Sequence, residues 1–140
     1  MKISRQLLDE LVAHVLEDPA NEICGVVAVE GDDGVGPEDA SAVRVYRAAN
    51  KHASPMKFEI EPAELLALYD AIDERGWRIG AIYHSHVRSR AYPSQTDVNF
   101  AANWPGVEWV IVGLAAGEQP DVRSYLIEDG AIREVPLRVS

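Results

Sequence analysis

The sequence predicts an α/β domain in the loose sense of that class, a sheet flanked by helices. Patterns typical of helices and of strands alternate along the chain, which favours a mixed architecture. Tight-turn signals between strands, of which Asp129-Gly130 is the strongest, favour hairpins and argue against a doubly wound parallel sheet. The chain has 140 residues, 47% of them hydrophobic, which suits one domain with a substantial core.

Two amphipathic helices are predicted in the first half of the chain. The first is capped by Ser4 and runs to about residue 18, because leucine and valine recur there with helical spacing. The second covers residues 63–75, with Pro62 at its start and Gly76 as its stop. His14 lies at the edge of the first apolar face, and we expect a half-buried surface histidine there.

Seven strands are predicted from apolar runs and period-two alternation. They cover residues 23–29, 43–49, 57–60, 79–86, 108–114, 122–128 and 131–139. The first two are joined by residues 30–41, a segment rich in Gly and Asp that we interpret as a solvated turn. A third helix is predicted to begin at Ser94 and to end before Trp104-Pro105-Gly106.

Composition limits the classes of function. The formal net charge of −10 argues against a nucleic-acid-binding surface, which needs clustered Lys and Arg, and favours a partner with a neutral or basic face. Cys24 is the only cysteine, so an intramolecular disulfide and a Cys-rich metal site are excluded, and we expect a small buried side chain there. The chain shows neither a signal-peptide pattern nor an apolar run of transmembrane length, so we expect a cytoplasmic protein without a membrane partner.

Two histidines end the predicted strand at residues 79–86. His84 and His86 are two residues apart, so both rings lie on one face of the strand and form a pair of candidate metal ligands. Asp97 follows at the opening of the third helix, close enough in sequence to fold back and supply an oxygen ligand. Two histidines and one carboxylate leave a fourth tetrahedral position open, which is typical of catalytic zinc.

Two other interpretations compete with this one. Ser94 and Asp97 also fit a helix capping box, in which serine and the acidic residue exchange hydrogen bonds with the backbone. Glu22, at the entrance of the strand at residues 23–29, is by itself an ordinary solvated strand end. Capping explains neither the paired histidines nor this glutamate. Beside a metal, Glu22 is instead a candidate general base for hydrolysis.

The spacing His-x-His, seven residues, then Ser-x-x-Asp resembles the motif of JAMM (MPN+) zinc metalloproteases in every position, and Glu22 stands where that family has its upstream glutamate. The resemblance covers essentially residues 1–140 as a single JAMM/MPN+ metalloprotease domain. It implies a curved, mostly antiparallel sheet of six to eight strands flanked by helices. It also implies one Zn²⁺ ion bound by His84, His86 and Asp97, with Glu22 as general base and Ser94 directed at the oxyanion.

Within the family, the stretch from Tyr-His-Ser-His to Ala-Tyr-Pro-Ser-x-Thr-Asp is similar to small stand-alone bacterial members that hydrolyse conjugates of ubiquitin-like sulfur-carrier proteins. The resemblance implies a zinc isopeptidase that cleaves after a C-terminal Gly-Gly and releases an amino acid, such as cysteine, or a conjugated amine. The chain lacks the insertions with which larger members grip ubiquitin. We therefore expect the motif strand and the neighbouring strand at residues 43–49 to offer their backbones to the carrier's extended tail.

Three further residues are candidates for substrate binding. In the family, the asparagine corresponding to Asn50 lies near the active site, although a turn former is the alternative. Arg88 and Arg90, beside the motif, can hold a substrate carboxylate or carbonyl, or belong to a solvated loop. A general zinc peptidase and a non-catalytic MPN-type interaction module are the alternative functions. The oligomeric state is left open, a homodimer included.

Overall fold

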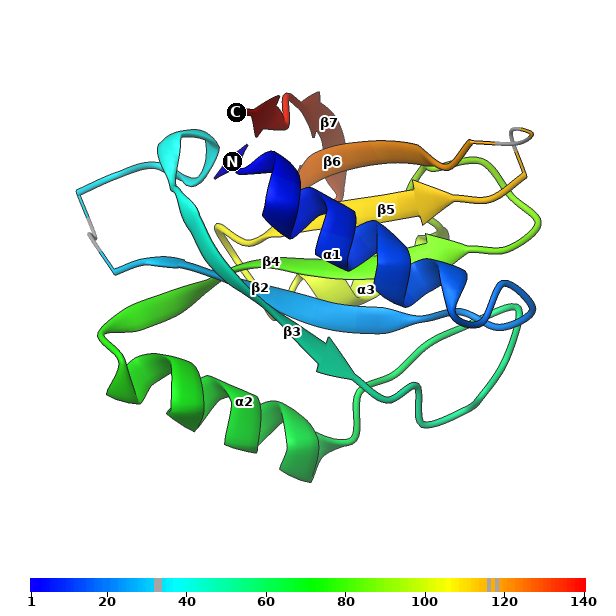
Figure 1. Ribbon diagram of the computed structural model, residues 1–140, viewed down its shortest axis with the longest axis horizontal. Helices are drawn as coiled ribbons and strands as arrows, with labels where there is room; N and C mark the ends of the chain where they lie inside the picture. The colour runs from blue at the N-terminus through cyan, green and yellow to red at the C-terminus, as the bar shows by residue number, and fades with distance from the viewer. Residues whose placement is uncertain (32–33, 116, 118) are drawn as a thin grey trace.

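The computed structural model describes residues 1–31, 34–115, 117 and 119–140. A twisted sheet lies at the centre, with helix α1 across one face (Figure 1). The helices are α1 (Arg5–Leu16), α2 (Pro62–Glu74), α3 (Gln95–Ala101) and a short 3₁₀ turn, η1 (Pro37–Asp39). The strands are β1 (Lys2–Ile3), β2 (Cys24–Glu30), β3 (Ala42–Ala48), β4 (Trp77–His86), β5 (Glu108–Gly113), β6 (Asp121–Glu128), β7 (Ala131–Val135) and β8 (Arg138–Val139).

The main sheet has the strand order β3-β2-β4-β5-β6-β7. The β4–β5 pair is parallel and the other four pairs are antiparallel. The prediction of a mostly antiparallel sheet flanked by helices is therefore confirmed. Strand β4, which ends in the paired histidines, lies in the middle of the sheet, with Cys24 of β2 and Ile111 of β5 in register on either side of His84.

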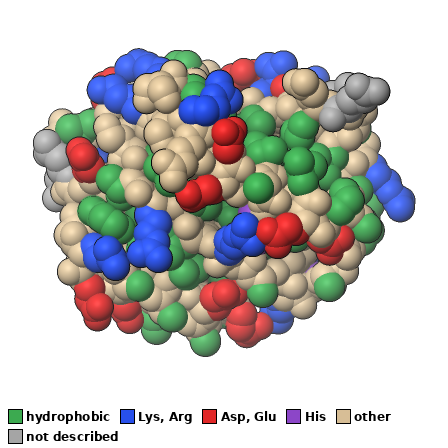
Figure 2. Space-filling view, in the orientation of Figure 1, with side chains coloured by type: hydrophobic (Ala, Val, Ile, Leu, Met, Phe, Trp, Pro, Cys, Tyr) green, Lys and Arg blue, Asp and Glu red, His purple; other side chains and the backbone are tan. Residues whose placement is uncertain are grey.

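Two apolar clusters cover the two faces of the sheet. Along β4, Ile82 packs into the cluster that includes residues from α2 and α3, whereas Ala81 and Tyr83 pack into the cluster beneath α1. The alternation along β4 thus contributes to both layers, as expected for a strand buried on both faces. On the molecular face shown in Figure 2, Lys and Arg side chains are interspersed with acidic and apolar ones. No helix within the described residues is long and apolar enough to cross a membrane.

Local signals placed several element boundaries correctly. Ser4 caps α1, its Oγ accepting from the Leu7 backbone at 3.2 Å. Gly76 follows α2 with a φ of +74°, the left-handed conformation that favours glycine at a helix end. Asp129 and Gly130, with φ of 52° and 78°, form the tight turn between β6 and β7. In the predicted turn at residues 30–41, Asp32 and Asp33 lie outside the described residues.

The strand predicted at residues 131–139 is wrong, because two strands replace it. β7 ends at Val135, and β8 pairs in parallel with β1 at the other end of the chain. Pro136 separates them, and it has no N–H with which to continue the ladder of the main sheet.

The strand predicted at residues 57–60 is also wrong, since this segment has no regular structure. Phe58 and Ile60 are buried, so the period-two pattern is real. The polar backbone groups, however, find partners outside any ladder. The Glu59 oxygen accepts from the Lys51 backbone at 2.8 Å, and the Glu59 nitrogen donates to Asn50 Oδ1 at 3.1 Å. Alternating burial therefore does not require a strand here.

His14 is buried rather than half-exposed as predicted, with 7% of its surface accessible. Its Nδ1 lies 2.5 Å from the Tyr83 hydroxyl, on the α1 face of the sheet. Burial lowers the pKa of His14, and the nearby Arg47 charge lowers it further. A neutral His14 is therefore part of the core on the face that does not carry the paired histidines.

Candidate metal centre

Four predicted site residues meet at the end of β4. His84 and His86 occupy the last alternate positions of that strand, Glu22 lies just before β2, and Asp97 lies in the first turn of α3. The side chains of all four are buried. Because β2 and β4 are antiparallel neighbours, the start of one lies beside the end of the other, which brings Glu22 to the histidines.

The spacing of the ring nitrogens and the carboxylate suits a metal ion. His84 Nε2 lies 3.1 Å from His86 Nε2 and 3.2 Å from Asp97 Oδ2, and His86 Nε2 lies 3.3 Å from the same oxygen. A tetrahedral zinc ion with bonds of 2.0–2.1 Å separates its ligand atoms by about 3.3–3.4 Å. The three atoms therefore form a triangle of nearly the size of one tetrahedral face around zinc.

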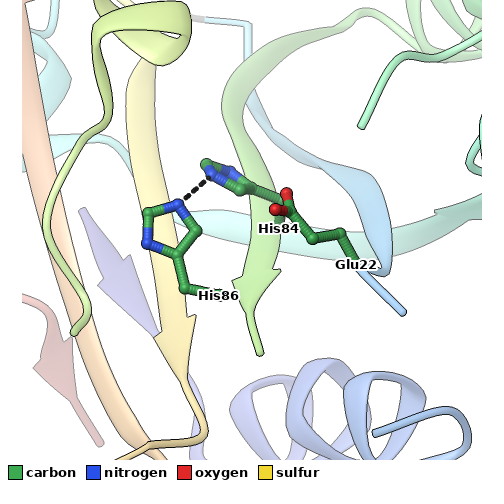
Figure 3. Close-up of side chains that lie close together, drawn as sticks. All are labelled: Glu22, His84 and His86. Atoms are coloured by element: carbon green, nitrogen blue, oxygen red, sulfur yellow. Dashed lines mark hydrogen bonds between the residues drawn. The ribbon is translucent and has the colours of Figure 1, made fainter. Parts of the chain in front are cut away.

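Glu22 approaches the same space from the segment just before β2, as Figure 3 shows. One of its carboxylate oxygens and a ring nitrogen from each of His84 and His86 lie within 4.8 Å of one another, so these three residues also form a group that could hold an ion. Burial raises the pKa of Glu22 to about 7, with the Asp97 charge adding to the rise and His86 opposing it. A carboxyl group of this kind can exchange a proton near neutral pH.

Asp97 and Ser94 form the capping box. Ser94 Oγ accepts from the Asp97 backbone at 3.1 Å, and Asp97 Oδ2 accepts from the Ser94 backbone at 2.9 Å. Burial alone would raise the pKa of Asp97, but the charge and hydrogen bond of His84, the bond to His86 and the Ser94 backbone lower it well below its usual range. The cap uses the serine hydroxyl only as an acceptor, so its proton remains available to another group. Capping and a role at the site are compatible.

The two histidines are oriented by different means. His86 Nδ1 lies 2.9 Å from the main-chain oxygen of Arg90, which fixes Nδ1 as the donor and leaves Nε2 as an acceptor or ligand. His84 Nδ1 has no hydrogen-bond partner among the residues that the structure describes. Its ring is instead stacked on Phe58, with centroids 4.3 Å apart, and meets the edge of Trp109 at 6.4 Å. Burial lowers the pKa of His84.

The predicted substrate-binding residues lie around this centre without joining it. Arg88 and Arg90 have exposed side chains on the loop after β4, and the Arg90 guanidinium lies over the Tyr92 ring, 4.6 Å from its centroid. Asn50 bonds to the main-chain oxygen of Glu22 at 3.1 Å. The sequence patterns did not identify Phe58 as a neighbour of the histidines. The only sequence signal that bears on it is the alternation of polar and apolar residues at 57–60, which is typical of a side chain that faces the core.

An apolar cavity of about 260 Å³ adjoins the centre. Phe58, which stacks on His84, and Trp109, which meets its edge, both line this cavity. The cavity extends between α2 and α3 and is lined further by Ile60, Leu65, Phe100 and Trp104. The centre therefore has an apolar compartment next to its polar groups, the usual composition of a ligand site.

The motif strand cannot offer its backbone to a substrate, contrary to our expectation. β4 pairs with β2 on one side and with β5 on the other, and even the His86 oxygen accepts from the Leu114 backbone at 3.0 Å. β3, the other candidate, pairs only with β2 in the main sheet and lies at its edge. Of the two strands, only β3 can add a peptide to that sheet.

The sequence matches the family of prokaryotic homologs of the JAB domain over residues 4–128. The chain belongs to this family. A CysO-cysteine peptidase of Mycobacterium tuberculosis is 34% identical over 138 residues, which are 98% of this chain and 89% of that protein. A probable TtuB-protein conjugate cleaving protease of Thermus thermophilus is 33% identical over 138 residues, 98% of this chain and 81% of the relative.

Solved structures share the fold. A protein of Desulfitobacterium hafniense has a TM-score of 0.84 at 27% identity, covering 99% of this chain and 92% of its own. A JAB1/MPN domain protein from Archaeoglobus fulgidus has a TM-score of 0.62 at 19% identity, and the match covers 99% of this chain and 98% of that protein's chain. The predicted JAMM (MPN+) membership and its fold are thereby confirmed. The relatives named above are peptidases and proteases of protein conjugates.

Proposed function

We propose that residues 1–140 form one zinc peptidase domain that hydrolyses the amide bond after the C-terminal Gly-Gly of a small ubiquitin-like or sulfur-carrier protein. The observation that carries this proposal is the triangle of His84 Nε2, His86 Nε2 and Asp97 Oδ2, with edges of 3.1, 3.2 and 3.3 Å. These three residues would hold one Zn²⁺ ion. When bound, such an ion polarises a carbonyl group and acidifies water.

Glu22 is the general base in this proposal. Its carboxylate is buried at 6% accessibility beside the two histidines, and its raised pKa suits a group that takes a proton and later gives it up. It accepts the proton of the attacking water and passes that proton to the leaving amine. The amide carbon thereby gains a hydroxyl group and the amine departs neutral, so the hydrolysis balances with one water consumed.

Ser94 donates a hydrogen bond from its hydroxyl group to the carbonyl oxygen as negative charge develops there. Its Oγ also accepts a hydrogen bond from the Asp97 backbone and so caps α3. Ser94→Ala is therefore expected to lower the stability of the fold by about 1 kcal/mol, through loss of the cap, and to lower turnover roughly a hundredfold. Melting temperature and kcat, taken where both proteins are folded, measure the two losses separately. Ser94→Thr retains a hydroxyl and serves as the control. An unchanged kcat in a destabilised Ser94→Ala protein would reduce Ser94 to a helix cap.

The choice of substrate rests on the relatives and on the surroundings of the site. The two relatives act, by name, on cysteine joined to CysO and on TtuB conjugates. An extended carrier tail can pair with the edge of β3, whose Ala48 is in register with Cys24 and hence with His84. The cavity beside Phe58 accepts an apolar side chain of that tail. The leaving group is an amino acid such as cysteine, or a conjugated amine.

The test is to offer the zinc-loaded protein a small ubiquitin-like carrier with one cysteine joined by an amide to its Gly-Gly end. The carrier is expected to lose that residue, as followed by mass, and a chelator is expected to stop the reaction. A matched carrier ending in Gly-Ala is expected to be cleaved on the order of tenfold to two-hundredfold more slowly, because the proposed site selects glycine there and one added methyl group is worth about 1–3 kcal/mol. Equal cleavage of both carriers would indicate a general zinc peptidase, and cleavage of neither a non-catalytic interaction module.

A further inference from the structure

The side chain of Asn50 is engaged entirely by main-chain groups. Its Nδ2 donates to the main-chain oxygens of Glu22 and Lys57, at 3.1 and 3.0 Å. Its Oδ1 accepts from the main-chain nitrogens of His52 and Glu59, both at 3.1 Å. A carboxamide has two N–H donors and two acceptor lone pairs. All four are used within the protein, so none is left for a substrate.

One of these four bonds, together with a backbone bond to Ser54, fixes the segment that carries Glu22. Asn50 holds the Glu22 oxygen, and the Glu22 nitrogen donates to the Ser54 oxygen at 2.8 Å. Both main-chain polar groups of Glu22 are therefore held by residues 50–54. Glu22 precedes β2 and lies outside its hydrogen-bond ladder. These two bonds therefore satisfy and fix the main-chain polar groups of Glu22, as strand pairing does for the residues that follow.

Two of the other bonds fix Phe58. Asn50 holds the Lys57 oxygen and the Glu59 nitrogen, the polar groups on either side of Phe58. A metal-binding histidine is usually oriented by a hydrogen bond at its second nitrogen, and His84 Nδ1 lacks such a partner in the described chain. Phe58 stacks on the His84 ring at 4.3 Å, with 24° between the planes, and Trp109 lies edge-to-face with it at 6.4 Å, so Phe58 is the aromatic neighbour nearest to the ring and helps to set its tilt.

We propose that Asn50 is a positioning residue that holds Glu22 and Phe58 in place about His84, and that it is not the substrate contact predicted from its place in the sequence. This inference rests on the proposed function, because it assigns Glu22 and His84 their roles there. Asn50 acts through Glu22 and Phe58 at once, because its side chain joins the segment before β2 to the segment that covers the His84 ring.

Kinetics on the cysteine-bearing carrier test this role. Asn50→Ala is expected to lower kcat on the order of tenfold to a hundredfold, as small misplacements of catalytic groups do, and to leave KM unchanged. Should Asn50→Ala fail to fold, Asn50→Asp carries the test, because it keeps the shape and both accepted bonds but sets a carboxylate oxygen, which cannot donate, against the main-chain oxygens of Glu22 and Lys57. Ser54→Ala is the control. It removes another bond of the same loop, from the Met56 backbone to Ser54 Oγ at 3.0 Å, and is expected to behave like the wild type.

Two kinetic outcomes would overturn the inference. A raised KM with an unchanged kcat would make Asn50 a substrate contact, and a lower melting temperature with an unchanged kcat would make it a purely structural residue. If the wild type cleaves no carrier, the proposed function fails, and the inference is judged by the histidine ring signals in NMR spectra of zinc-loaded protein. Movement of Phe58 is expected to shift the His84 signals in Asn50→Ala and not in Ser54→Ala. Unchanged His84 signals would refute the positioning role.

Discussion

Glu22→Gln is expected to retain one zinc ion per chain and to lose at least about a hundredfold in kcat, as removal of general acid–base catalysis typically does. Glutamine has nearly the shape of glutamate and keeps an oxygen in place, but it cannot accept a proton from water at neutral pH. The backbone bonds from Asn50 and to Ser54 do not involve the side chain, so the segment retains its position. Elemental analysis and turnover of the same preparation measure the two properties.

Glu30→Gln is a matched control, because Glu30 is an exposed glutamate at the other end of β2 and its replacement removes the same charge. Near-normal turnover of metal-loaded Glu22→Gln would exclude Glu22 as the base. Loss of zinc from that variant would have a different meaning. It would make Glu22 a ligand, a role that its place within 4.8 Å of the two histidines also permits.

His84→Ala is expected to abolish stoichiometric zinc and, with it, all measurable hydrolysis. A site with three protein ligands that loses one of them loses most of its affinity, and the remaining His86 and Asp97 no longer surround the ion. Zinc binding also stabilises the folded protein, by about 2.7 kcal/mol at a free concentration one hundred times Kd. Adding zinc is therefore expected to raise the melting temperature of the wild type and not that of His84→Ala.

His52→Ala provides the comparison, since His52 is an exposed histidine whose only bond to Asn50 uses its backbone. Metal content by elemental analysis and melting curves with and without chelator should separate the two variants. A full zinc complement in His84→Ala would remove His84 from the set of ligands.

Features of the fold that depend on neighbouring residues could be predicted from the sequence. Ser4 caps its own helix, Asp129-Gly130 turns its own hairpin, and the placement of His84 and His86 on one face follows from the period of a strand. The structure of the two ends of the chain was harder to predict. β1 and β8 are only two residues long, and they pair with each other although they lie at opposite ends of the sequence. No local sequence pattern predicts such a pairing.

The surroundings of the candidate site could be predicted only in part. The spacing from His86 to Asp97 is short, so one loop and one helix start suffice to bring those residues together. The alternation of polar and apolar residues at 57–60 agrees with the burial of Phe58 and Ile60, but it did not reveal which groups would satisfy the backbone. A side chain, that of Asn50, takes the place of a neighbouring strand. Choices of partner between distant segments are settled by packing, which local patterns do not encode.

His84 Nδ1, which has no hydrogen-bond partner among the described residues, sets a requirement of the proposed site against the stability of the fold. A buried polar atom without a partner costs about 1–3 kcal/mol of stability, and this one lies among Phe58 and Trp109 in a largely apolar setting. An aliphatic residue at position 84 would suit those neighbours better than histidine does. Selection for folding alone would thus tend to erase the proposed ligand, whereas selection for the proposed reaction would retain it. If the proposed reaction retains His84, a descendant of this chain released from that reaction is expected to lose His84 early and to remain folded.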